Sequence, residues 1–218
     1  MKQKIYLITG LMASGKSTVS DLLAKSIEKC VHLRGDVFRK MIISGRENMS
    51  ATPSAEAVRQ LYLRYKLTAD AARSYFDNGF SVVIQDNYYG DELNRMINYL
   101  HKYPVEVVVL CPDVETIKER ERYREKTGYS GFTVETLYDT FMQTTPRIGF
   151  WLDNSNQTPQ ETAETAITPN SLAVSPFQML SLYAPKSSFM FTISYVLPTI
   201  KIQMLFEPSH PYQILIPL

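Results

Sequence analysis

The sequence lacks several features that mark whole classes of protein. It has only two cysteines, Cys30 and Cys111, and three histidines, without the spacing of a metal site or a disulfide framework. No uncharged apolar run approaches the ~18 residues of a membrane-spanning helix, and the N-terminal residues lack the layout of a signal peptide. We therefore expect a cytoplasmic protein with two buried, reduced thiols.

An excess of charge of either sign is also missing. Lys and Arg number 23 and Asp and Glu number 22, so the formal net charge is +1. This balance gives no reason to expect nucleic acid or an anionic membrane as a partner. A length of 218 residues is enough for one sizeable domain with a core of α/β size, and the sequence leaves the oligomeric state open.

The C-terminal part of the chain has very few charged residues and no glycine. Residues 168–218 contain three charged side chains, no glycine and seven of the twelve prolines. Their apolar residues follow no sustained helical period. We therefore divide the chain into a domain over 1–167 and a Pro-rich extension over 168–218. We expect the extension to be poorly ordered or non-native, as a shifted reading frame would make it; a genuine addition packed against the sheet is the alternative.

The most specific motif present is GLMASGKS at residues 10–17, which fits the phosphate-binding pattern G-x-x-x-x-G-K-[ST]. An apolar, β-branched run precedes it and a helical pattern follows, which is the context that the motif needs. The glycines allow close backbone approach, and the loop amides and helix N-terminus attract an anion. The lysine reaches the β- and γ-phosphates, and the hydroxyl of Ser17 ligates Mg²⁺. ATP is thus predicted to bind at Gly10, Ala13, Ser14, Gly15, Lys16, Ser17 and Thr18.

Apolar strands alternate with helical patterns over the first 167 residues. The alternation predicts an α/β fold, a three-layer sandwich with a five-stranded parallel sheet. With the P-loop this indicates a P-loop NTPase, and its kinase type is what the resemblance given below implies. The expected strands span 4–9, 31–34, 81–85, 105–110 and 147–152. Helices are expected after the P-loop, after Thr133 and Thr158, and over 37–44, 54–77, 93–100 and 114–126.

Two aspartates follow predicted strands, at the edge of the sheet where this class of fold binds ligands. Asp36 follows the second strand, where a carboxylate can accept a proton from an acceptor hydroxyl; the alternative is a cap for a helix beginning at Val37. Asp86 ends the third strand, where it can hold Mg²⁺ through water; the alternatives are a turn cap and an acceptor contact. Three basic residues after Asp36 either hold an anionic acceptor or are surface charges: Arg39, Lys40 and Arg46.

A run of charged residues over 118–126 carries Arg120 and Arg124, four residues apart on one helix face. Arginines on a mobile lid can neutralise charge on a transferring phosphoryl group. Gly128 and Gly131 are placed to act as hinges of such a lid. The alternative is a solvated helix crossed by surface ion pairs.

Over residues 1–167 these motifs resemble those of the P-loop small-molecule kinases. The resemblance is closest to the chloramphenicol-phosphotransferase-like group, whose relatives include zeta toxins and tunicamycin-resistance proteins. It is carried by GLMASGKS, by RGDVFR after the second strand, by QD at the end of the third, and by RERYREKTGY. It implies an ATP- and Mg²⁺-dependent phosphotransferase acting on the hydroxyl of a small molecule. Its catalytic residues are then Asp36 as base, Lys16, and Arg120 or Arg124.

Two alternative functions stay open at this point. One is a nucleotide-sugar kinase of the zeta-toxin type. The other is an ATP-binding resistance protein that sequesters a ligand without phosphorylating it. The identity of the acceptor separates the three hypotheses, and the sequence does not name it.

Overall fold

The computed structural model describes residues 2–50, 52–123, 129, 133–167, 194–197 and 200–203. The chain divides into two compact units, Met1–Gln178 and Met179–Leu218. The first unit contains a sheet of five strands, all parallel, in the order β2-β3-β1-β4-β5, which confirms the predicted fold class. The strands are β1 (Ile5–Gly10), β2 (Cys30–Arg34), β3 (Ser81–Gln85), β4 (Val105–Leu110) and β5 (Phe150–Leu152).

Helices connect these strands, and several begin at the capping residues that the sequence provides. The side chains of Ser54, Asp113 and Thr133 each accept a hydrogen bond from a backbone amide three residues on. Thr158 and Glu161 form a reciprocal capping box. The helices are α1 (Lys16–Ser26), α2 (Gly35–Lys40), α3 (Ala55–Asp77), α4 (Asp91–Tyr99), α5 (Val114–Arg122), α6 (Val134–Thr144) and α7 (Pro159–Ile167).

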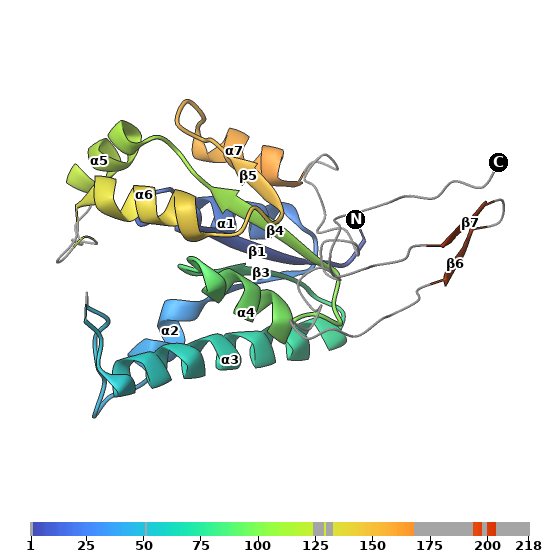
Figure 1. Cartoon of the computed structure of the whole chain (residues 1–218), viewed down its shortest axis with the longest axis horizontal. Coiled ribbons are helices and arrows are strands. Elements are labelled where there is room, and N and C mark those ends of the chain that lie inside the picture. Colours follow the sequence, from blue (N-terminus) through green and yellow to red (C-terminus); the bar gives the residue numbers. More distant parts are fainter. Residues whose placement is uncertain are drawn as a thin grey trace. The chain divides into compact units, whose positions relative to one another are not determined.

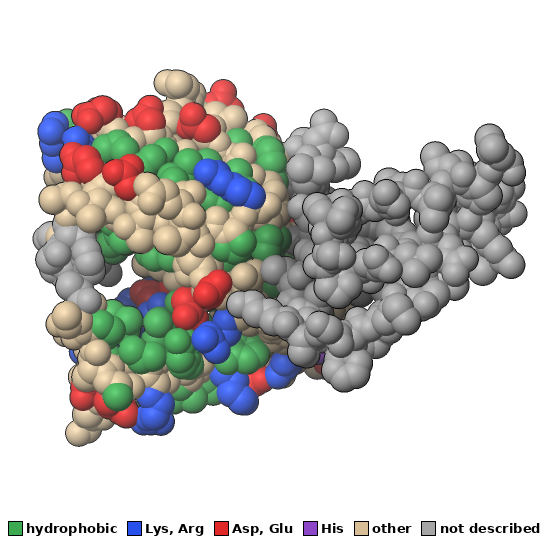
Figure 2. All heavy atoms as spheres, viewed as in Figure 1, with side chains coloured by type: hydrophobic (Ala, Val, Ile, Leu, Met, Phe, Trp, Pro, Cys, Tyr) green, Lys and Arg blue, Asp and Glu red, His purple; other side chains and the backbone are tan. Residues whose placement is uncertain are grey.

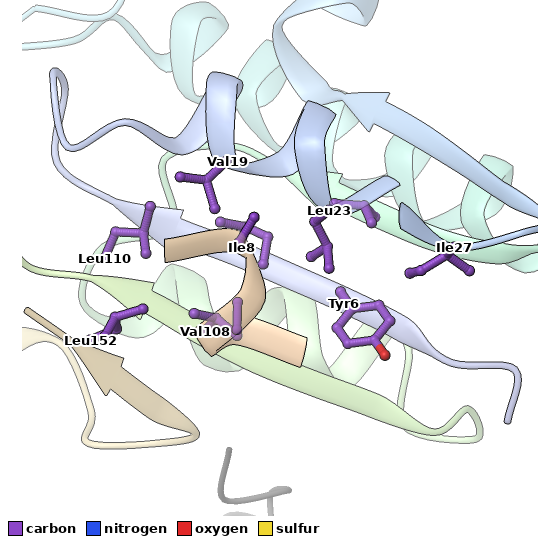
Figure 3. Close-up of a cluster of buried hydrophobic side chains, with 11 residues drawn as sticks. Tyr6, Ile8, Val19, Leu23, Ile27, Val108, Leu110 and Leu152 are labelled. Atoms are coloured by element: carbon purple, nitrogen blue, oxygen red, sulfur yellow. The ribbon is translucent and has the colours of Figure 1, made fainter. Parts of the chain in front are cut away.

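The sheet is the middle layer of the first unit (Figure 1). Side chains alternate across a strand, so Tyr6 and Ile8 of β1 face one side. There they pack with Val19 and Leu23 of α1 and with residues of β4, β5 and α7, as the close-up in Figure 3 shows. The opposite side faces α3 and α4, whose buried residues include Tyr65, Ala69, Leu93, Met96 and Ile97.

Three predicted elements differ from the structure by three residues or more at one end. The helix expected over 37–44 begins at Gly35 and ends at Lys40. The last strand begins at Phe150 instead of residue 147, because Gly149 has a φ of +75° and breaks the extended backbone. The helix expected to reach residue 126 ends at Arg122, and residues 124–126 lie outside the described residues. The two cysteines are free as predicted, but they are half-buried.

The second unit is described only over one antiparallel pair, β6 (Ser194–Leu197) with β7 (Ile200–Gln203). The remainder of the predicted extension lies outside the described residues, so its order and origin stay predictions. None of the helices in the described part is long and apolar enough to cross a membrane.

Ending the chain at Asn170 is expected to leave ATP binding intact and to increase the yield of soluble protein. The most C-terminal residues of the buried cluster under α1 belong to α7, which ends at Ile167, so the truncation removes none of them. The removed residues carry few charges to oppose aggregation. Calorimetric ATP titration and the soluble fraction after expression measure both effects. A truncated chain that fails to fold would show that the extension belongs to the domain.

Candidate active site

The loop between β1 and α1 has the backbone geometry of an anion site. Gly10, Ala13 and Gly15 have φ values of +144°, +64° and +96°. A Cβ on Gly10 would overlap the carbonyl oxygen of Leu110 on the neighbouring strand, so only glycine fits there. A left-handed alanine is uncommon and costs backbone strain. Such a loop, which leads directly into the N-terminus of α1, forms a concave nest for phosphate.

Lys16 lies inside this loop. Its side chain is buried and its ammonium donates hydrogen bonds to the carbonyls of Gly10 at 2.8 Å and Leu11 at 2.6 Å. Ser17 and Thr18 follow in the first turn of α1 and are exposed. Their hydroxyls are therefore open to a ligand at the same helix end where Lys16 places its positive charge.

A second layer of contacts holds the outer side of the loop. Asn154, which follows β5, donates from Nδ2 to the carbonyl of Ser14 at 3.1 Å. Arg120 of α5 donates to the same carbonyl at 3.4 Å and to the carbonyl of Asn154 at 2.9 Å. Tyr129 donates from its hydroxyl to the carbonyl of Met12 at 2.8 Å. Arg120 thus contacts the P-loop backbone itself.

Asn154 was not among the site residues predicted from the sequence. A single asparagine after a short strand carries no motif, and its partner is 140 residues away in the chain. The sequence offers no local signal that would have identified it. Arg124, which the sequence pairs with Arg120, lies outside the described residues.

Asn154→Ala is expected to weaken ATP binding about fivefold to tenfold, because a hydrogen bond of ~1 kcal/mol that holds the Ser14 carbonyl is lost. The side chain is buried, 2% exposed, so the melting temperature without nucleotide should also fall. Calorimetric titration and thermal unfolding measure the two effects. Asn156→Ala, in the exposed part of the same loop, is the matched control. Equal affinities for both variants would contradict a positioning role.

Asp36 lies in the first turn of α2, and Arg34 occupies the N-cap position. The alternative in which Asp36 caps a helix beginning at Val37 is therefore wrong, because the helix begins two residues earlier. The Oδ2 atom of Asp36 accepts a hydrogen bond from Lys40 at 2.6 Å, and Nε of Arg34 lies 3.6 Å from Oδ1. Burial raises the pKa of Asp36, but Lys40 and the nearby guanidinium groups outweigh it and hold the pKa below its usual range.

Asp86 is buried against Arg64 of α3. Nη2 of Arg64 donates to Oδ1 at 3.1 Å, Nε lies 3.0 Å from Oδ2, and the amide of Asn87 donates to Oδ1 at 2.8 Å. A Cβ on Gly35 would overlap this carboxylate, so a glycine before Asp36 lets the end of β3 approach α2. Burial raises the pKa of Asp86, although Arg64 opposes that rise.

Arg64 is the other functional residue that the sequence analysis missed. The structure buries Gln60 and Thr68, four residues to either side, but both are polar, so the sequence did not indicate that this face of the helix is buried. A charge between two buried positions on one helix face needs a buried partner.

Contacts join three of these elements: Arg64 of α3 pairs with the Asp86 carboxylate at the end of β3, and Gly35, directly before Asp36 on α2, lies against that carboxylate. The positive charges of Arg64 and Lys16 act on Asp86, and so does the negative charge of Asp36. Lys16 comes from the P-loop, Asp36 from α2, Arg64 from α3 and Asp86 from the end of β3. Within the described residues, no group of three or more His, Cys, Asp or Glu side chains gathers to hold a metal ion.

This arrangement has clear relatives among solved structures. A sugar kinase from Janibacter sp. HTCC2649 is 20% identical, covers 81% of this chain and 98% of its own, and superposes with a TM-score of 0.57. The tunicamycin resistance protein of Deinococcus radiodurans is 15% identical over 76% and 94%, with a TM-score of 0.57. The APS kinase CysC of Mycobacterium tuberculosis is 16% identical over 76% and 95%, with a TM-score of 0.55.

These likenesses bear out the sequence resemblance to P-loop small-molecule kinases at the level of the fold. No curated protein matches the chain. The model of the AAA domain family matches residues 5–143, a span that runs from β1 into α6 and includes the P-loop, Asp36, Arg64, Asp86 and Arg120. The chain therefore belongs to the AAA domain family, and its domain has the fold of the P-loop kinases.

Proposed function

We propose that the protein transfers the γ-phosphoryl group of ATP to a hydroxyl of a small molecule. The observation that carries this proposal is the geometry of the site: the phosphate-binding loop holds the buried Lys16, and Gly35, directly before the candidate base Asp36, lies against the buried Asp86 carboxylate. The sugar kinase and the APS kinase, the latter solved with AMPPNP and APS, support a small-molecule acceptor.

In this proposal the P-loop amides and Lys16 bind the β- and γ-phosphates, and Asp36 accepts the proton of the attacking hydroxyl. Asp36 is suited to that task because its lowered pKa keeps it ionised at neutral pH. Arg120 keeps the loop in shape through the Ser14 carbonyl. Arg120 and Arg124 are the candidates for neutralising charge on the transferring group.

Mg²⁺ fits the donors at this site. Ser17 offers an exposed hydroxyl beside the phosphate nest, and Mg²⁺ usually keeps several waters and takes its other ligands from phosphates and one or two protein oxygens. Asp86 is proposed to hold one of these waters and not the ion itself, because both of its carboxylate oxygens already face Arg64. The ion would neutralise charge on the phosphates when bound.

The test is a screen for ADP release with hydroxylated antibiotics, sugars and nucleotide sugars as acceptors. Product masses should increase by one phosphoryl group. Turnover confined to nucleotide sugars would favour a kinase of the zeta-toxin type. Tight, nucleotide-dependent ligand binding without any product would favour a sequestering protein and overturn the proposal.

Lys40→Gln is expected to shift the acid limb of the pH–rate profile to higher pH. Lys40 helps to hold the Asp36 pKa below its usual range, so its loss raises that pKa. The base is ionised above its pKa and is lost as pH falls through it, so the variant loses activity at a higher pH than the wild type. Rates measured from pH 4 to 8 reveal the shift. Lys66→Gln, which removes a similar i,i+4 pair on α3, should leave the profile unchanged.

A further inference from the structure

Positive charge gathers beside Asp36 without matching negative charge. Arg39 and Lys40 follow Asp36 by three and four residues on α2, which places all three along one side of the helix. Lys40 pairs with Asp36 and Arg64 pairs with Asp86. Among the described residues, neither Arg39 nor Arg46 takes part in an ion pair.

The segment that carries Arg46 is held in place from α3. The buried side chain of Gln60 donates from Nε2 to the carbonyl of Gly45 at 2.8 Å. Its Oε1 accepts from the amide of Glu47 at 2.9 Å. One side-chain amide therefore fixes the backbone on both sides of Arg46, as expected of a buried polar group whose hydrogen bonds are satisfied.

The polar side chains near Arg39 and Arg46 do not neutralise their charges, so both guanidinium groups are available to an anionic ligand. Glu47, the carboxylate next to Arg46 in sequence, accepts a hydrogen bond from Ser54. Within the described part of the chain, the Arg39 guanidinium donates to the neutral amide oxygen of Asn48 and to no carboxylate. Burial lowers the pKa of Arg39 most, the guanidinium groups of Arg64 and Arg46 lower it further, and the Asp36 carboxylate opposes the shift. Like charges held together in this way are stabilised by an anion between them.

We propose that Arg39 and Arg46 form a binding site for an anionic group of the acceptor, a carboxylate, phosphate or sulfate carried beside its reacting hydroxyl. This inference rests on the proposed function, since Asp36 on the same helix is the proposed base. Arginine suits the task because its planar fork binds such groups with two parallel hydrogen bonds. Figure 2 shows a recess on this face of the first unit, with basic and acidic side chains inside it.

The experiment measures anion binding to the full chain after the P-loop has been saturated with Mg²⁺ and AMP-PNP, so that phosphate and sulfate are kept from the nucleotide site. Equilibrium dialysis with radiolabelled sulfate, and separately with acetate, then reports the second site. The wild type should bind one further anion. Arg39→Gln combined with Arg46→Gln should weaken this binding about tenfold and leave AMP-PNP affinity within twofold. Tighter sulfate than acetate indicates a phosphate- or sulfate-bearing acceptor, and the reverse indicates a carboxylate.

Lys25→Gln combined with Lys66→Gln is the control for net charge, because it also removes two positive charges, from α1 and α3, but ones that pair with Asp21 and Asp70. It should bind sulfate as the wild type does. AMP-PNP binding with no second anion, or equal sulfate binding by both double variants, would overturn the anion site and leave the proposed function standing. Weakened AMP-PNP binding in the arginine variant would assign these residues to the nucleotide instead. Absence of AMP-PNP binding by the wild type would overturn the proposed function itself.

Discussion

Asp36→Asn is expected to lower the rate of phosphoryl transfer by about 10²–10⁴-fold at saturating ATP and acceptor, the usual contribution of a general base. Asparagine keeps the size of the side chain but cannot accept the proton of the acceptor hydroxyl. ATP affinity should stay near that of the wild type, because Asp36 lies on α2 and not in the P-loop. The rate should recover partly as pH rises if the acceptor ionises unaided.

Product formation by the asparagine variant decides the role of Asp36. If the rate falls by no more than about threefold, the decrease is much smaller than the loss of a general base causes. Asp36 would then not be the base, and Asp86 would become the candidate. The fold should survive the change, since the Asp36 side chain is 35% exposed and its pairs with Lys40 and Arg34 are on the surface. A melting temperature equal to that of the wild type is the control for folding.

Lys16→Ala is expected to weaken ATP binding and to remove nearly all transfer, with a loss of at least ~10²–10³-fold, as when one charge-stabilising donor is removed from an active site. The ammonium supplies the positive charge nearest the predicted β- and γ-phosphates. Titration with ATP and single-turnover transfer measure the two losses separately. Wild-type affinity and ATPase rate in this variant would show that the P-loop assignment is wrong.

Lys16→Met separates charge from structure in that experiment. In the wild type the ammonium donates to the carbonyls of Gly10 and Leu11, so any replacement leaves both carbonyls without this donor. Methionine keeps the apolar stem of the side chain, whereas alanine also leaves a gap. Equal loss of transfer in the two variants would assign the effect to charge. A smaller loss in the methionine variant would assign part of it to packing.

The sequence predicts those parts of the site that depend on neighbours in the chain. The P-loop is a contiguous motif, Asp86 directly follows a β-branched strand, and Asp36 comes two residues after a predicted strand, so both could be placed at the sheet edge. Arg64 and Asn154 act through partners 22 and 140 residues away, and such partners are chosen by tertiary packing. The start of α2 at Gly35 was missed for the same reason, since the fit of Gly35 to Asp86 involves a distant strand.

The position of β1 in the sheet links the site to global unfolding. β1 is hydrogen-bonded to β3 on one side and β4 on the other, and all six of its residues are buried. Backbone amides in such a strand exchange with solvent only when the whole domain opens. The P-loop begins at its last residue, so the nucleotide site cannot melt locally at that end. Loss of ATP binding on heating should therefore report the unfolding of the entire domain.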